Sequence, residues 1–178
     1  MSIKLSDRRC EEIKKIVVNM YKIYDIHCVP ISSFEIATKM NIKIRPYPET
    51  KKEIFIKKSE DGFSVLKEKG WYIYYNDEKS YTRINNTIMH EVAHILLDHT
   101  EDSELAEKEV KFFAKYALCP PVLIHILKLK SAEEISKKFE ISYQAAGYAL
   151  NYYKKWKVYG GMDYTNYELQ TIELFNVG

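Results

Sequence analysis

Two histidines and a glutamate within five consecutive residues carry the most specific chemistry in this sequence. His90, Glu91 and His94 stand in the pattern His-Glu-x-x-His. Because four residues are just over one helical turn, the two imidazoles project from the same face of a helix and can share a divalent metal. The carboxylate of Glu91 lies beside them, where it can take a proton from a water molecule activated by that metal. The spacing therefore predicts a hydrolytic metal site.

The residues around this motif predict a helix that lines a cleft. On a helical wheel the polar side chains fall within one arc of about 100°, and apolar residues fill the rest of the circle. The arc holds Thr87, His90, Glu91, His94 and Asp98. A helix with a broad solvent-facing side would show a wider charged face. In the alternative interpretation, the two histidines merely form hydrogen bonds on a partly buried helix.

Catalytic zinc usually has a third protein ligand, which must come from further along the chain. The metzincin pattern is excluded, because Leu97 and Thr100 stand where it requires Gly and His. Several carboxylates follow, and any of them could complete the site. The candidates are Glu101, Glu104, Glu107 and Glu109.

A helical wheel over residues 103–118 separates these candidates. Glu107 falls on a charged face, four residues before Lys111, where the two can pair. Glu109 falls in the middle of the apolar face, where an unpaired carboxylate costs on the order of several kcal/mol. We therefore expect Glu109 to be the third metal ligand. The alternative is that Glu109 binds a buried backbone group or an Arg.

Two residues after the motif are candidates for supporting roles. Asp98 lies on the polar arc and could either orient a metal ligand or cap the end of the helix. His99 lies off the arc, and we expect it on the surface, with a place near the mouth of the cleft as the alternative. His27 and His125 have no companion at ligand spacing, and we expect both to be structural.

Composition bounds the class of protein. The net charge of +2 is too small to favour nucleic acid or a membrane surface by itself. No segment approaches the roughly 20 apolar residues that span a bilayer, and the first residues lack a signal-peptide core. The cysteines, Cys10, Cys28 and Cys119, are odd in number and form no CxxC pair. We therefore expect a cytoplasmic protein without disulfides.

The order of predicted elements is typical of an α+β fold. We expect N-terminal helices over residues 6–24 and 33–40, then strands at 42–47, 53–58, 62–67 and 71–76. Helices follow at 86–99, 103–118, 121–129, 131–139 and 142–156. The strands should form a small, mostly antiparallel sheet packed on the helix of the histidine motif. We expect a metal-site domain over 1–130, a helical hairpin over 131–157 packed on it, and a tail over 158–178.

With these residues in place, the chain resembles the ImmA/IrrE family of metallopeptidases, which is gluzincin-like. The strongest likeness is the segment 87–97, Thr-Ile-Met-His-Glu-Val-Ala-His-Ile-Leu-Leu. Segments 109–114 and 118–120 are similar to the family's Glu-Ala-Asn-x-Phe-Ala and Leu-[Met/Leu]-Pro, with Val-Lys and Cys as departures. The resemblance covers about residues 1–157.

The resemblance implies a function. By likeness, His90, His94 and Glu109 match the family's metal ligands, and Glu91 matches its catalytic acid and base. The metal would be Zn²⁺, although Mn²⁺ or another divalent ion also suits such ligands. Family members cleave helix-turn-helix repressors of mobile elements or stress regulons, which implies a protein substrate in the cytoplasm.

Two other functions compete with this one. Segments 133–142 and 143–150 have the apolar spacing of a helix-turn-helix, and Lys154, Lys155 and Lys157 follow, so a DNA-binding regulator is the second hypothesis. The second helix offers no Arg for base or phosphate contacts, which counts against it. The third hypothesis is a peptide-binding module with a non-catalytic metal. The oligomeric state stays open.

Overall fold

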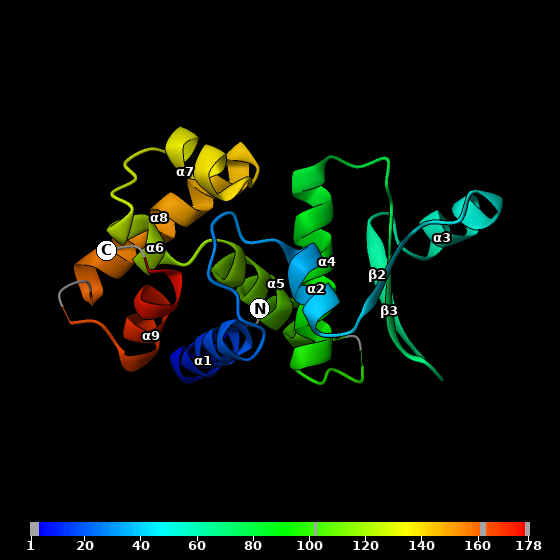
Figure 1. The fold of residues 1–178 in the computed structure, drawn as a ribbon, viewed down its shortest axis with the longest axis horizontal. Helices are drawn as coiled ribbons and strands as arrows, with labels where there is room; N and C mark the ends of the chain where they lie inside the picture. Colours follow the sequence, from blue (N-terminus) through cyan, green and yellow to red (C-terminus); the bar gives the residue numbers. More distant parts are fainter. Residues whose placement is uncertain (1–3, 102, 161–162, 177–178) are drawn as a thin grey trace.

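The computed structural model describes residues 4–101, 103–160 and 163–176, which form helices and one small sheet (Figure 1). The helices are α1 (Asp7–Ile23), α2 (Ser33–Lys39), α3 (Lys52–Lys58), α4 (Tyr81–Leu96), α5 (Glu104–Leu118), α6 (Pro121–Ile126), α7 (Ala132–Phe139), α8 (Tyr143–Tyr159) and α9 (Asn166–Phe175). The strands are β1 (Lys43–Pro46), β2 (Gly62–Lys67) and β3 (Gly70–Tyr75), and a 3-10 helix, η1 (Glu49–Lys51), precedes α3. The expected α+β class is confirmed.

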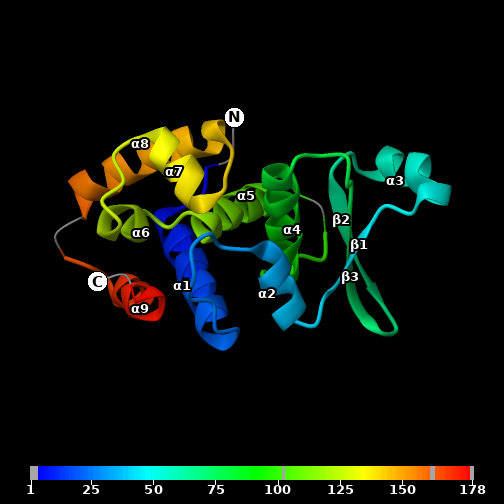
Figure 2. The same cartoon turned by 45° about the horizontal axis from the view of Figure 1, so that its top comes forward.

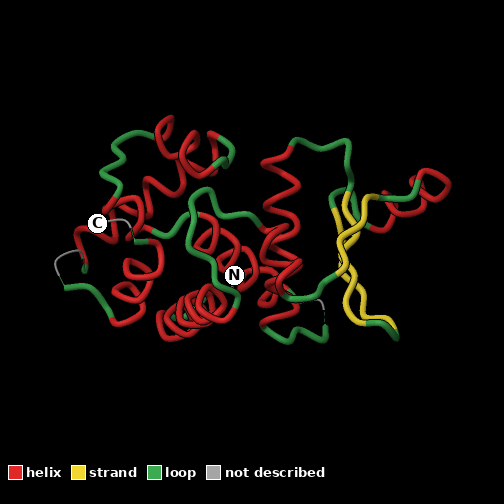
Figure 3. Tube along the Cα trace, viewed as in Figure 1, coloured by secondary structure: helices red, strands yellow, loops and turns green. Residues whose placement is uncertain are grey.

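Helix α4 lies between the sheet and most of the other helices, whereas α3 lies beyond the sheet (Figures 1 and 3). It contacts β2 and β3 on one side, and α2 and α5 on others. Ile88 and Val92 of α4 are fully buried, together with Ile73 of β3 and Phe113 of α5. Burial of these apolar side chains fixes α4 at the centre of the fold, so the polar arc of this helix is held in a defined place.

The sheet is mixed, with strand order β1-β3-β2. Strand β2 pairs antiparallel with β3, with Ser64 opposite Ile73, and a tight turn before Gly70 joins them. Strand β1 pairs parallel with β3, with Ile44 opposite Ile73. The sequence predicted a mostly antiparallel sheet. The difference arises because the chain passes through η1 and α3 after β1 and returns to the sheet on the far side of β3.

The strand expected over residues 53–58 is wrong, because these residues form α3. A short apolar run cannot be assigned to a strand or a helix by its periodicity alone. Helix α3 packs on the sheet through Phe55, whose ring contacts the rings of Tyr47, Phe63 and Tyr74 at centroid distances of 5.3 to 5.4 Å. Ile54 stays 66% exposed, so an alternating strand face has no counterpart here.

Helix α1 packs along α5 and α9 (Figure 2). Its first turn is capped by Ser6, whose side chain accepts a hydrogen bond from the backbone N–H of Arg9. Ile13 and Val17 on its inner face are fully buried. This packing matters for the site, since it places Arg9 beside α5.

The C-terminal helices form a second group around α6. Helices α7 and α8 pack against each other as the expected hairpin, and α8 also contacts α6. The sequence predicted only a tail after residue 157, but residues 166–175 form α9, which packs on α1 and α6. Thr165 and Glu168 form a capping box at its start, a signal visible in the sequence.

Among the described residues, no helix combines the length and the hydropathy that a membrane crossing requires.

Candidate active site

Three side chains from α4 and α5 converge in the described part of the chain as a possible metal centre: His90, His94 and Glu107. The Nε2 atoms of His90 and His94 are 3.3 Å apart, as expected for residues four apart on α4. Oε1 of Glu107, from α5, lies 3.3 Å from Nε2 of His94 and 3.6 Å from Nε2 of His90. Packing of α4 on α5 therefore brings together two nitrogen donors and one oxygen donor.

The spacing of these three atoms fits one zinc ion. Zinc binds imidazole nitrogen and carboxylate oxygen at about 2.0–2.2 Å, and in tetrahedral geometry such ligand atoms lie about 3.3–3.5 Å apart. The three separations observed here are 3.3, 3.3 and 3.6 Å. Three protein ligands leave a fourth position for water or substrate, which is the arrangement of catalytic zinc.

Protonation in the cluster also suits a metal. Burial lowers the pKa of His90, which favours the neutral imidazole that can bind a metal. Burial opposes ionisation of Glu107, but the imidazoles of His90 and His94, when they are protonated, and the ammonium of Lys111 outweigh it, so the pKa of this carboxyl lies below its usual value. A neutral imidazole and an ionised carboxylate are the forms in which these groups act as ligands.

Glu109, which the sequence predicted as the third ligand, lies elsewhere. Arg9 donates two hydrogen bonds to its carboxylate, from Nε at 2.8 Å and from Nη2 at 2.7 Å. Nε2 of His99 lies 3.0 Å from Oε2 of the same carboxylate. Residues two apart on a helix do not face the same way, so the side chains of Glu107 and Glu109 leave α5 in different directions.

The physical argument for Glu109 was sound about burial and incomplete about the partner. Its side chain is only 8% exposed, as the apolar face predicted. The partner is an Arg, the alternative stated for it, and it comes from α1, 100 residues away in sequence. Glu107 was set aside because it can pair with Lys111, and that pair is present at 3.4 Å, but the same carboxylate also reaches the histidines.

Glu91 is held by the edge strand of the sheet. Its side chain is largely buried, and Oε2 accepts hydrogen bonds from the backbone N–H of Ser64 at 2.8 Å and from its hydroxyl at 2.7 Å. Strand β2 can approach α4 this closely because residue 62 is Gly. A Cβ atom there would lie 2.6 Å from Cγ2 of Thr87 and 2.9 Å from the carbonyl oxygen of Tyr74.

Asp98 caps the end of α4. It adopts the left-handed conformation, with φ 53°. The backbone N–H of Asp98 binds the carbonyl of Ile95, and the N–H of His99 binds the carbonyl of His94, which together make a Schellman motif. Of the two roles considered for Asp98, the geometry matches the cap.

His99 is not on the surface, where the sequence placed it first, since its side chain is 13% exposed. The Schellman turn folds it back against α4, and its Nδ1 lies 3.3 Å from Nδ1 of His94. The remaining histidines lie outside the cluster. His27 is about half exposed beside Asp25, and His125 contacts the hydroxyl of Tyr153 at 2.9 Å.

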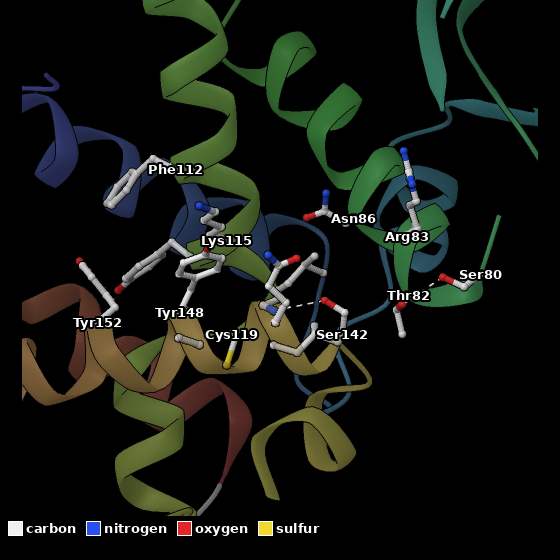
Figure 4. A pocket seen from close by; sticks show the side chains of 16 residues that line it. Ser80, Thr82, Arg83, Asn86, Phe112, Lys115, Cys119, Ser142, Tyr148 and Tyr152 are labelled. Atoms are coloured by element: carbon white, nitrogen blue, oxygen red, sulfur yellow. Dashed lines mark hydrogen bonds between the residues drawn. The ribbon is translucent and has the colours of Figure 1, made fainter. Parts of the chain in front are cut away.

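A cavity of about 710 Å³ is lined by residues of α4, α5 and α8 (Figure 4). Asn86 of α4, Phe112 and Lys115 of α5, and Tyr148 of α8 are among the residues that line it. Asn86 lies one turn before His90 on α4. Glu107 and Lys115 lie two turns apart on α5. Asn86 therefore lies on the same side of α4 as His90, and the residues that line the cavity do not include His90, His94 or Glu107.

Comparison with known families agrees with this geometry. The family model of the IrrE N-terminal-like domain, Peptidase_M78, matches residues 34–151, about two thirds of the chain. This range contains α4, α5 and the sheet, and it leaves out α1. No curated protein matches the chain. With the cluster of His90, His94 and Glu107 inside the matched range, the chain belongs to the peptidase family of the IrrE N-terminal-like domain.

Proposed function

We propose that this protein is a zinc-dependent endopeptidase whose metal is held by His90, His94 and Glu107. The observation that carries the proposal is the triangle of donor atoms, with sides of 3.3 to 3.6 Å, in a chain of a peptidase family. Manganese or another divalent ion suits the same nitrogen and oxygen donors. Zinc is the choice that best matches the compact triangle.

The residues around the metal have separate tasks. The metal would supply a Lewis acid that polarises a water molecule and the scissile carbonyl. Glu91 accepts the proton of the attacking water and returns it to the leaving amine. Two hydrogen bonds from Ser64 hold Oε2 of Glu91. Strand β2, at the edge of the sheet, therefore fixes the orientation in which this carboxylate reacts.

The cavity beside the cluster favours a protein substrate. Its lining is largely apolar, with Arg83 and Lys115 as cationic groups, and it includes Asn86, which lies one turn before His90 on α4. We infer that it receives an apolar side chain of the substrate near the scissile bond. A segment of polypeptide that crosses the metal cluster would be fixed on one side by this contact.

The substrate we propose is a cytoplasmic regulatory protein, namely a helix-turn-helix repressor of a mobile element or stress regulon. The support is the resemblance to the ImmA/IrrE family in segments 87–97 and 109–120. A cytoplasmic place agrees with three free cysteines, of which Cys28 is exposed and Cys119 is buried.

The DNA-binding alternative has less support. Gln144 and Tyr148, on the helix that would read DNA, line the cavity toward α5. The lysines that follow, Lys154, Lys155 and Lys157, are exposed but lie at the other end of α8. Because side chains of this second helix, α8, already face α5, the helix is poorly placed to enter the major groove of DNA.

Cleavage of candidate repressors, read by mass spectrometry of the fragments, tests the proposal. The zinc-loaded protein should cut at least one of them at a defined bond. Glu91→Gln should keep its zinc and lose at least a hundredfold in rate, since it cannot accept the proton. Glu101→Gln, an exposed neighbour, is the matched control and should cut normally. Full turnover by Glu91→Gln with metal bound would overturn the proposed role of Glu91.

A further inference from the structure

The outer face of the sheet, which is the side turned away from α4, carries cations and aromatic rings. Ser64 binds Glu91 of α4, and Ile73 is fully buried, so these two residues mark the inner face. Because side chains alternate along a strand, the residues next to them point outward. Apart from Val65, the outward positions of the three strands are Lys43, Arg45, Phe63, Lys67, Tyr72 and Tyr74.

The strand register places aromatic rings between cations on this outer face. Lys43 of β1 stands opposite Tyr72 of β3. Nζ of Lys43 lies 4.9 Å from the centroid of the Tyr72 ring, and Nζ of Lys67 lies 4.7 Å from it. The rings of Tyr72 and Tyr74 are 6.2 Å apart between centroids, with 12° between their planes. Positive charge and aromatic surface therefore alternate across the face.

The cations of the outer face form no ion pair with a carboxylate among the described residues. Nζ of Lys43 donates to a backbone carbonyl at 2.8 Å, and Nη1 of Arg45 donates to another at 3.0 Å. Nζ of Lys67 donates to the hydroxyl of Tyr74 at 2.8 Å. All of these partners are neutral, so the face keeps three positive charges in a chain whose net charge is only +2.

The outer face is open to solvent except at one end. Helix α3 covers that end, where the Phe55 ring lies 5.3 Å from the ring of Tyr74. No other described helix lies on this side of the sheet (Figures 1 and 2). Arg45 and Lys67 are exposed, and Tyr72 is half-buried. One ligand can therefore reach the rings and the cations together.

We propose that the outer face binds single-stranded nucleic acid. A single strand offers phosphates to the cations and unpaired bases to the rings of Tyr72 and Tyr74, and proteins that bind single strands use this combination. A duplex keeps its bases stacked on one another, and an acidic polypeptide offers carboxylates without a base for each ring. When a strand binds, the bases take the place of the ammonium groups that cover the Tyr72 ring, and these groups move to the phosphates.

This binding is separate from the proposed peptidase. The strand lies on the opposite side of the sheet from Glu91, which α4 holds against the inner face through Ser64. It also differs from the DNA-binding alternative, which would use α8 and the lysines at its end. Neither zinc nor a protein substrate is needed to measure it.

Fluorescence anisotropy with labelled oligonucleotides of about 12 nucleotides, one of deoxythymidine and one of uridine, measures the binding. We expect the full chain to bind at least one of them saturably. With three cations at phosphates, the logarithm of the association constant should fall with the logarithm of the salt concentration at a slope of about −2, since each contact contributes about −0.7 on a single strand. Absence of binding to both oligonucleotides at low salt would overturn the proposal.

Three competitors distinguish a single strand from other anions: duplex DNA of the same length, poly-glutamate, and vesicles that contain phosphatidylglycerol. Each should compete about tenfold less well than the unlabelled single strand, because none of them offers unpaired bases to the rings. Equal competition by any of the three would overturn the proposal, since it would show that the face recognises negative charge alone.

Variants of the outer face test the two kinds of contact separately. Tyr72→Leu removes one ring and should weaken binding about 5- to 100-fold without a change in the salt slope. Lys43→Gln should weaken binding and make the slope shallower by about 0.7. Tyr159→Leu and Lys155→Gln are the matched controls and should bind as the wild type does, because both residues are exposed on α8.

Thermal unfolding of each variant shows whether the fold is intact, so a loss of affinity is not confused with a loss of structure. Wild-type affinity in folded Tyr72→Leu, or a wild-type salt slope in folded Lys43→Gln, would contradict the proposal.

Discussion

Oε1 of Glu107 lies 3.3 Å from Nε2 of His94, across the interface between α5 and α4. This contact joins two helices that both contribute buried apolar side chains to the core, such as Val92 and Phe113. The third donor of the cluster therefore comes with the fold, and no loop has to close to supply it. Such a preformed site costs little reorganisation when a metal enters.

Ser64→Ala should slow peptide hydrolysis roughly tenfold and leave zinc affinity unchanged. The change removes the hydroxyl that binds Glu91 at 2.7 Å and keeps the backbone N–H that binds it at 2.8 Å, so orientation is weakened and not lost. Steady-state kinetics measures the rate of hydrolysis, and chelator competition on the same preparation measures the zinc affinity. A parallel loss of zinc would show that Ser64 supports the metal centre as a whole.

Gly62→Ala should lower the free energy of unfolding by about 1–3 kcal/mol, because the new methyl group overlaps Thr87 and the backbone of Tyr74. Gly147→Ala is the matched control. It lies within α8, where an added Cβ atom meets nothing within 4 Å, and it should stabilise the protein by about 0.5–1 kcal/mol. Urea unfolding measures both. Equal effects in the two variants would contradict the close packing of β2 on α4.

Asp98→Gly and Asp98→Val should act in opposite directions. Gly adopts the left-handed conformation of residue 98 without strain, so this variant should keep or raise stability and keep zinc affinity. Val is strained there by about 1–2 kcal/mol and should displace His99, with weaker zinc binding as the result. Thermal unfolding and chelator competition report the two effects. If both variants behaved alike, the cap would not be what places His99.

Local patterns in the sequence predicted most of what local physics decides. The helix of His90 and His94 and the two strands that form β2 and β3 depend on residues close together in the chain. The α9 helix was missed although its capping box at Thr165 is local, and residues 158–178 were expected only as a tail.

The identity of the third donor could not be settled by local patterns, because it depends on which helices pack on α5. A helical wheel shows that Glu107 and Glu109 lie on different faces, but it does not show that α4 covers the first and α1 the second. The sequence near α5 gives no sign that Arg9 pairs with Glu109, since 100 residues separate the two. Burial of Glu109 was therefore predicted correctly, and its Arg partner was foreseen only as the alternative to a metal.

Metal content of the purified protein tests the central claim most directly, with wild type, Glu107→Ala and Glu104→Ala compared by elemental analysis after equilibration with zinc. We expect about one zinc per chain in the wild type and in Glu104→Ala, whose side chain lies on the exposed side of α5. Glu107→Ala should lose most of its zinc, because two imidazoles alone form an incomplete site. A full complement of zinc in Glu107→Ala, or none in the wild type, would contradict the account.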